Sequence, residues 1–255
     1  MVREDSKVSE LKFLVYKLID YYRPSVRPGD SFFYDMYMNN IIITTRKEAA
    51  VTDEQLYALF NSAYDQWRDN SLDYPFLHKS FEDFQKSIDR VLVTIAIDTA
   101  TGEPVGMRGV ACYRKKRYAF DFCLSVAPEY KRKGIATKLM EFEKERLRQK
   151  GYRYLTCTTS ADAHWSVNWH RKMGYLITGY HLSSKSSGPT YSYRMQLLCD
   201  PLHHLTDLFW TRPLAPVTAR CSLALSYAIT WLMKDNRGND NFIGRVARRM
   251  VHQGH

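Results

Sequence analysis

A basic loop with a single glycine joins a predicted strand to a predicted helix near the middle of the chain. Residues 125–137 read SVAPEYKRKGIAT. The residues before the loop continue a strand, and residues 137–144 carry apolar side chains at the spacing typical of a helix. The first N–H groups of a helix lack intrahelical acceptors and lie at the positive end of its dipole, so they can bind an anion. The sequence therefore predicts a phosphate-binding loop in which Gly134 allows close approach, although such a loop can also simply turn the chain.

A second segment, SVNWHRKMGY at residues 166–175, follows a predicted strand over 154–158. We predict a short helix that ends at Gly174, because a glycine in the left-handed conformation commonly closes a helix. The next strand would then begin at Tyr175.

Together the two segments resemble the GNAT superfamily of acyl-CoA-dependent N-acetyltransferases. The pyrophosphate loop of that family reads Gln/Arg-x-x-Gly-x-Gly/Ala, a few residues after a strand that ends in Val-x-Pro. The matching residues here are Val126, Pro128, Lys131, Gly134 and Ala136. Residues 166–175 resemble the second motif, roughly Ser/Ala-x-x-Leu/Phe-Tyr/His-x-Lys-x-Gly-Phe/Tyr, in the right order and at a fitting separation. The chain departs from the family at Lys131, where Gln or Arg is usual, and at Ala163, where Asn is often found.

The resemblance implies a reaction and a binding site. Acetyl-CoA would be the cosubstrate, and its acetyl group would pass to a primary amine by direct attack in a ternary complex; no metal is implied. The backbone N–H of Val126 is the candidate donor to the thioester oxygen, and we expect the contact at residue 131 to use backbone N–H groups. The expected cofactor-binding residues are Leu124, Val126, Lys131, Arg132, Lys133, Gly134, Ile135, Ala136 and Thr137.

Two residues are candidates for proton transfer. His170 occupies the position at which many family members carry a tyrosine that reprotonates the CoA thiolate, and an imidazole can donate near neutral pH. The alternative is that His170 only bonds the cofactor or fills space. Asp121 is the candidate base, directly or through water, and strand alternation predicts that it shares a face with Cys123 and Ser125. It could equally pair with an arginine at a strand edge.

Two other functions stay open. One is a transferase that uses a longer acyl-CoA or a hydroxyl acceptor, and the other is a non-catalytic acyl-CoA-binding or scaffold module. The sequence does not identify the acceptor. The formal net charge of +10 invites a nucleic-acid hypothesis, but the basic excess lies over residues 114–153, around the loop. A basic rim there would attract the phosphates of coenzyme A, so we expect no nucleic-acid partner.

The composition is that of a soluble globular protein, with 45% hydrophobic and 25% charged residues in 255. The charged first residues lack the apolar core of a signal peptide, so we expect a cytoplasmic location. The five cysteines show no metal-ligand or disulfide spacing, and we expect buried free thiols.

Periodicity and the resemblance together predict an α/β (α+β) fold, with a mixed, mostly antiparallel sheet flanked by helices. A helical extension over 1–32 precedes a GNAT-like domain over 33–199. A capping box at Thr52 and a start near Ser80 mark two helices whose connecting loop, 69–75, would form a wall of the acceptor pocket. The predicted strands are 40–46, 90–97, 104–113, 118–126, 154–158, 175–182 and 190–198.

Residues 200–255 form a helical extension that lies outside the resemblance. Residues 217–233 are apolar but too short for a membrane span, and Arg220 lies within them. Residues 242–251 predict an amphipathic helix with Arg245 and Arg248 beside its apolar face. We expect this helix to dock on its own core, next on a second subunit in a homo-oligomer, and last on an anionic membrane surface.

Overall fold

The computed structural model describes residues 40–69, 78–182, 189–199, 205–211, 213–235 and 238–253. One compact unit runs from Asn40 to His255 and includes the helices that follow the sheet. The predicted helical extension over 1–32, its boundary after residue 32 and most of the loop over 69–75 lie outside the described residues.

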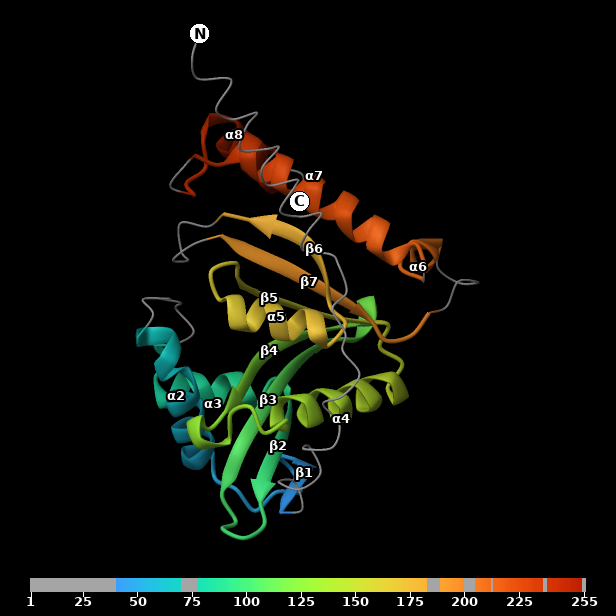
Figure 1. Ribbon diagram of the computed structural model, residues 1–255. Coiled ribbons are helices and arrows are strands. Elements are labelled where there is room, and N and C mark those ends of the chain that lie inside the picture. Colours follow the sequence, from blue (N-terminus) through green and yellow to red (C-terminus); the bar gives the residue numbers. More distant parts are fainter. Residues whose placement is uncertain are drawn as a thin grey trace. The chain divides into compact units, whose positions relative to one another are not determined.

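A mixed sheet of seven strands, ordered β1-β2-β3-β4-β5-β7-β6, forms the centre of this unit (Figure 1). Every neighbouring pair is antiparallel except β4 and β5, which run parallel. The predicted fold class is therefore confirmed, and the predicted strands agree with the observed ones to within a few residues at each end. The strands are β1 (Ile41–Thr45), β2 (Leu92–Asp98), β3 (Pro104–Tyr113), β4 (Tyr118–Val126), β5 (Tyr154–Ser160), β6 (Leu176–His181) and β7 (Thr190–Gln196).

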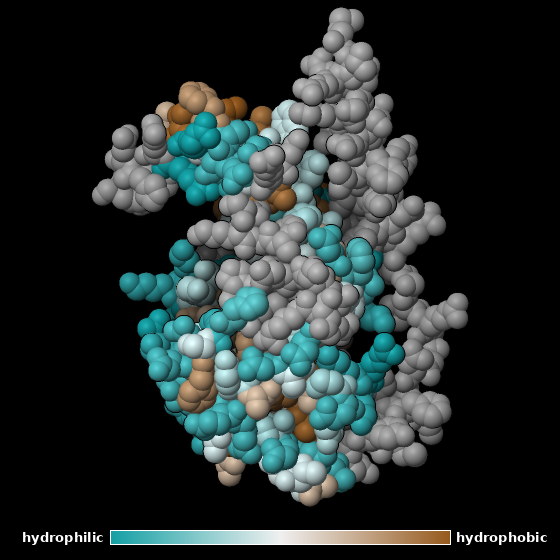
Figure 2. Space-filling model, turned by 90° about the vertical axis from the view of Figure 1, so that its left-hand side faces the viewer, coloured by the Kyte–Doolittle hydropathy of each residue, from teal (hydrophilic) through white to brown (hydrophobic). Residues whose placement is uncertain are grey.

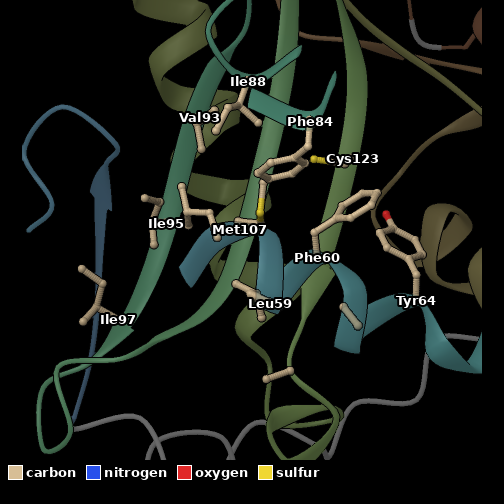
Figure 3. Close-up of a cluster of buried hydrophobic side chains, with 13 residues drawn as sticks. Leu59, Phe60, Tyr64, Phe84, Ile88, Val93, Ile95, Ile97, Met107 and Cys123 are labelled. Atoms are coloured by element: carbon tan, nitrogen blue, oxygen red, sulfur yellow. The ribbon is translucent and has the colours of Figure 1, made fainter. Parts of the chain in front are cut away.

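Helices α2 (Asp53–Asp69) and α3 (Phe81–Ile88) cover one face of the sheet. Their predicted starts are confirmed: the Gln55 N–H donates to the Thr52 hydroxyl at 3.3 Å, and the Gln55 side chain accepts from the Thr52 N–H at 2.9 Å. Ser80 accepts from the Asp83 N–H as the N-cap of α3. Figure 3 shows the apolar cluster between these helices and the strands, which includes Leu59, Phe60, Phe84, Ile88, Val93, Ile95, Met107 and Cys123.

Helix α4 (Ile135–Gln149) covers the opposite face. A Cβ built on Gly106 would lie 2.7 Å from Ile135 Cγ2, so the helix approaches the β3 backbone at a position that only glycine fits. Since Gly106 and Met107 are consecutive strand residues, their side-chain directions are opposite, and α4 and the apolar cluster lie on different faces.

The C-terminal extension consists of α6 (Leu205–Leu208), α7 (Ala215–Met233) and α8 (Phe242–Gln253). Helix α7 lies along β6, the edge strand (Figure 1). The Ser226 hydroxyl accepts from the Tyr180 N–H at 2.7 Å and the Thr230 hydroxyl donates to the Tyr180 carbonyl at 3.0 Å. These bonds satisfy backbone groups that would otherwise offer the edge to another chain. No described helix is long and apolar enough to cross a membrane.

Two sequence expectations need correction here. The cysteines are free, but only Cys123 and Cys157 are buried. Cys199 and Cys221, the last two in the sequence, are exposed. Helix α8 packs on the end of α7 and half-buries Val246 and Ala247, yet Phe242, Ile243 and Met250 stay exposed.

Candidate active site

The predicted phosphate loop has a backbone shaped to present N–H groups. It leaves β4 through a 3-10 turn, Pro128–Tyr130, and then takes left-handed conformations at Arg132, with φ 64°, and at Gly134, with φ 80°. A positive φ is uncommon for arginine. A left-handed residue followed by a right-handed one, as at Gly134 and the helical Ile135, points successive N–H groups into one concavity, which favours an anion.

The start of α4 adds further donors to this loop. The first intrahelical bond runs from the Lys138 N–H to the Gly134 carbonyl at 3.0 Å. The N–H groups of Ile135, Ala136 and Thr137 therefore have no acceptor within the helix. The Ile135 side chain is buried against the sheet, so this residue can contact a ligand only through its backbone N–H.

The basic side chains of the loop divide into two kinds. Lys131 reaches back to α2, where its Nζ donates to the Ala63 carbonyl at 3.4 Å. Arg132 and Lys133 are exposed, and the Lys133 ammonium lies 4.8 Å from the centre of the Tyr130 ring. They supply positive charge around a site whose direct donors are backbone groups.

The parallel strands β4 and β5 diverge beside the loop. Their register covers only residues 118–120 of β4 and 154–156 of β5. Farther along β4, the Ala127 N–H donates to Val105 of β3 at 3.0 Å. Because successive N–H groups point to opposite edges of a strand, those of Leu124 and Val126 face away from β3, toward the side where β5 has diverged.

Tyr64 of α2 was not singled out from the sequence, yet its hydroxyl lies at this edge. It donates to the Leu124 carbonyl at 3.1 Å and accepts from the Leu124 N–H at 3.3 Å. Burial raises the pKa of Tyr64 far above its usual value, so the hydroxyl keeps its proton at neutral pH. The available signal was a tyrosine on an apolar helix face, where a hydroxyl needs a partner.

A β-bulge changes the expected position of Asp121. The register between β3 and β4 shifts, so that Gly109 pairs with Cys123 while Val110 pairs with Asp121. Cross-strand partners share a face and consecutive residues do not, so Asp121 and Cys123 lie on opposite faces. The prediction that Asp121 shares a face with Cys123 and Ser125 is wrong because alternation fails at a bulge.

Asp121 faces α4 and is held by a buried arginine. The fully buried Arg108 Nε donates to Asp121 Oδ1 at 2.9 Å, its Nη2 pairs with Oδ2, and the Tyr175 hydroxyl donates to Oδ2 at 3.1 Å. The open alternative, an ion pair with arginine, is the arrangement observed, although Arg108 lies in a central strand and not at an edge. Both carboxylate oxygens of Asp121 accept hydrogen bonds, so Asp121 can orient the side chains of Arg108 and Tyr175.

His170 lies on α5 (His164–Lys172), close to the helix end. The predicted C-cap is confirmed, since Gly174 has φ 88°, its N–H donates to the Arg171 carbonyl, and the Tyr175 N–H donates to the His170 carbonyl. The ring of His170 stacks on Tyr193 with centroids 4.9 Å apart.

The protonation state of His170 follows from its contacts. Nδ1 lies 2.7 Å from the Ser166 carbonyl, which only accepts, so Nδ1 carries the hydrogen. Burial lowers the pKa of His170 below its usual value of 6.5, which favours the neutral ring with an unprotonated Nε2 at pH 7. Such a ring can accept a proton more readily than donate one.

Comparisons with known proteins agree with this geometry. Residues 54–175 match the model of the Acetyltransferase (GNAT) family, and no curated protein sequence gives a significant match. The fold is similar to ribosomal-protein-S18-alanine N-acetyltransferase from Escherichia coli, at 14% identity and TM-score 0.51 over 64% of this chain and 98% of that one. It is also similar to Ard1 from Thermoplasma volcanium, at 13% identity and TM-score 0.50 over 62% and 99% of the two chains. A chain of the NatC complex bound to Gag peptide and CoA shows 16% identity and TM-score 0.50 over 62% and 99%.

Identities this low show a shared fold, and they leave substrates undetermined. The family match covers the predicted loop, the diverging strands and the second motif. Residues 54–175, slightly less than half of the chain, therefore match the GNAT acetyltransferase family.

Proposed function

We propose that this protein transfers an acetyl group from acetyl-CoA to a primary amine. The observation that carries the proposal is the loop at the start of α4, with left-handed backbone at Arg132 and Gly134 beside the diverging edge of β4. The match of residues 54–175 to the GNAT family supports acyl transfer, and the similar NatC structure was determined with CoA.

In this proposal backbone groups do most of the binding. The N–H groups of residues 132–137 hold the pyrophosphate, and Arg132 and Lys133 attract the remaining phosphate. The Val126 N–H faces the gap beside β5 and donates to the thioester oxygen as negative charge develops there. One preorganised donor of this kind typically contributes a few kcal/mol, and the juxtaposition of the two substrates contributes more.

Transfer also requires two proton movements. The amine nitrogen uses its lone pair to form the new C–N bond, and the C–S bond breaks with its electron pair on sulfur. Nitrogen then loses the proton that sulfur finally gains. We assign His170 to accepting the amine proton at Nε2, in place of the donor role expected from the sequence, because its Nδ1 hydrogen is fixed by Ser166. Asp121 is assigned to positioning, through Tyr175 and Arg108.

Calorimetric titration with acetyl-CoA and longer acyl-CoAs tests the cofactor site. The Gly134→Glu variant introduces bulk and negative charge at a position with φ 80°, so acetyl-CoA binding should weaken at least about tenfold, or about 1.4 kcal/mol. The matched control is Gly151→Glu, which has the same strain at φ 75° and lies at the opposite end of α4. It should bind acetyl-CoA as the unmodified protein does.

The result decides between the functions left open by the sequence. Acetyl-CoA binding that is lost only in Gly134→Glu would justify a screen of amine acceptors. Binding of longer acyl-CoAs alone would replace acetyl transfer with transfer of a longer chain. A folded protein that binds none of them would retain the fold without the reaction.

A further inference from the structure

Helix α7 is apolar on the side turned away from the sheet. Ala215, Ala219 and Leu223 are buried on its inner side. Apolar side chains outside this inner side include Leu225, which is 63% exposed, and Ile229 on its flank, which is 45% exposed. Helices that are apolar all round are normally covered by protein or lipid, so this outer side is expected to have a partner.

Helix α8, which is in contact with α7, presents a second apolar surface. Phe242 is 73%, Ile243 55% and Met250 69% exposed, and all three lie on one side of the helix. We call these residues, together with Val217, Leu225, Ile229 and Leu232 of α7, the C-terminal apolar surface. Figure 2 shows brown and teal side chains next to each other where α7 and α8 lie.

The charge beside this surface is positive. Helix α7 contains Arg220 and no acidic residue, and α8 contains Arg245 and Arg248, again without an acidic residue. Two acidic residues, Asp235 and Asp240, lie between the helices, and Asp240 is paired with Lys234 at 2.6 Å and also with Arg248. An apolar surface with a cationic margin is complementary to an anionic partner.

This charge pattern distinguishes between the possible partners. In a symmetric dimer the same patch meets itself, so the arginines of two copies would be brought together. Like charges opposed across an interface are unfavourable. Anionic lipid offers hydrocarbon to the exposed leucine, isoleucine and phenylalanine side chains and negative headgroups to the arginines.

We propose that the C-terminal apolar surface binds the face of an anionic lipid bilayer, with α7 and α8 lying in the interfacial region. No described helix can span a membrane, so the association is peripheral. The proposal changes the order of partners expected from the sequence, in which the membrane surface came last, because Phe242, Ile243 and Met250 of α8 stay exposed. It would place the acetyltransferase domain next to acceptors at a membrane surface.

Flotation of the full chain with vesicles tests the proposal. The probes are phosphatidylcholine vesicles with and without about 30% phosphatidylserine, a content chosen to give a strongly negative surface. The protein should float with the anionic vesicles and remain below with the neutral ones. The double variant Leu225→Glu, Ile229→Glu should reduce the bound fraction at least about tenfold, because it removes buried apolar area and adds negative charge. Arg245→Gln should weaken binding about fivefold.

The matched control is Ile42→Glu on β1, since Ile42 is 50% exposed and far from the extension in sequence. It should float like the unmodified protein, and all variants should keep the same circular dichroism and unfolding temperature. Absence of flotation with anionic vesicles would overturn the proposal without requiring any variant. Equal flotation with neutral vesicles would overturn its electrostatic part. A dimer in light scattering that Leu225→Glu, Ile229→Glu dissociates, without vesicle binding, would assign the surface to a second copy.

Discussion

Both faces of the sheet bury apolar side chains, but the face covered by α4 also buries charged groups, although consecutive residues of one strand supply both faces. Met107 points into the apolar cluster under α2 and α3, with Phe60 and Phe84. The next residue, Arg108, points the other way and is fully buried against Asp121 and Tyr175. An apolar face tolerates changes of shape, whereas a buried ion pair tolerates the loss of neither partner. The comparison suggests that the first face holds the fold and the second fixes the geometry near the proposed transfer site.

Breaking the ion pair should have the largest effect on stability. In Arg108→Met the Asp121 carboxylate keeps its burial and loses its guanidinium partner, so the free energy of unfolding should fall by about 3–5 kcal/mol. Urea denaturation followed by circular dichroism measures this quantity.

The neighbouring residue provides the matched control. Met107→Leu conserves volume on the apolar face and should cost less than about 1.5 kcal/mol. The double variant Arg108→Met, Asp121→Leu removes both charges and should recover much of the loss. If Arg108→Met lowered the free energy of unfolding no more than Met107→Leu does, the proposed difference between the two faces would be refuted.

The sequence predicts the sheet face covered by α2 and α3 better than the face covered by α4. Helix periodicity, the capping box at Thr52 and the Ser80 cap are local patterns, and each leads to the element observed. The loop at Gly134 and the C-cap at Gly174 are also local, since both depend on a residue that can take a positive φ. The partner of Asp121 could not be derived, because a bulge shifts the register and the fully buried Arg108 comes from another strand.

A smaller effect is expected from His170, which lies on the polar face. If its Nε2 accepts the amine proton, His170→Gln should lower kcat/KM for acetyl transfer about 100-fold, or about 2.7 kcal/mol. The reaction needs the neutral ring, so activity should fall as the pH drops through the pKa of His170. Because burial lowers that pKa, the fall should occur below pH 6.5. A pH profile of kcat/KM with an amine acceptor measures both effects.

The control for this prediction is His181→Gln. His181 also has a pKa lowered by burial, but it lies at the end of β6 and has no assigned part in the reaction. The variant should keep the acid limb of the profile, whereas His170→Gln should lose it. Nitrogen-detected NMR should show the hydrogen of His170 on Nδ1. A hydrogen on Nε2 at neutral pH would instead restore the donor role that the sequence suggested.

The smallest expected effect concerns Glu143 of α4, a further buried acid on the polar face. Its side chain is fully buried, Thr94 donates to Oε2, Arg146 lies 3.5 Å away, and Oε1 has no hydrogen-bond partner within the part of the chain that the structure describes. Burial raises the pKa of Glu143 above its usual value of 4.5 despite these partners. The unfolded chain therefore releases this proton at a lower pH than the folded protein does.

That difference fixes the sign of the pH dependence. Below pH 4.5 Glu143 is protonated in both states, and its contribution to stability is fully present. As the pH rises through the folded pKa, that contribution is lost. Glu143→Gln cannot ionise, so from pH 4.5 to 7 its free energy of unfolding should improve relative to the unmodified protein by on the order of 1 kcal/mol. Urea denaturation across this range measures the difference. If the free energy of unfolding of Glu143→Gln instead fell relative to the unmodified protein as the pH rose, the contacts with Thr94 and Arg146 would outweigh the cost of burial. The face covered by α4 would then stabilise the fold as well as shape it.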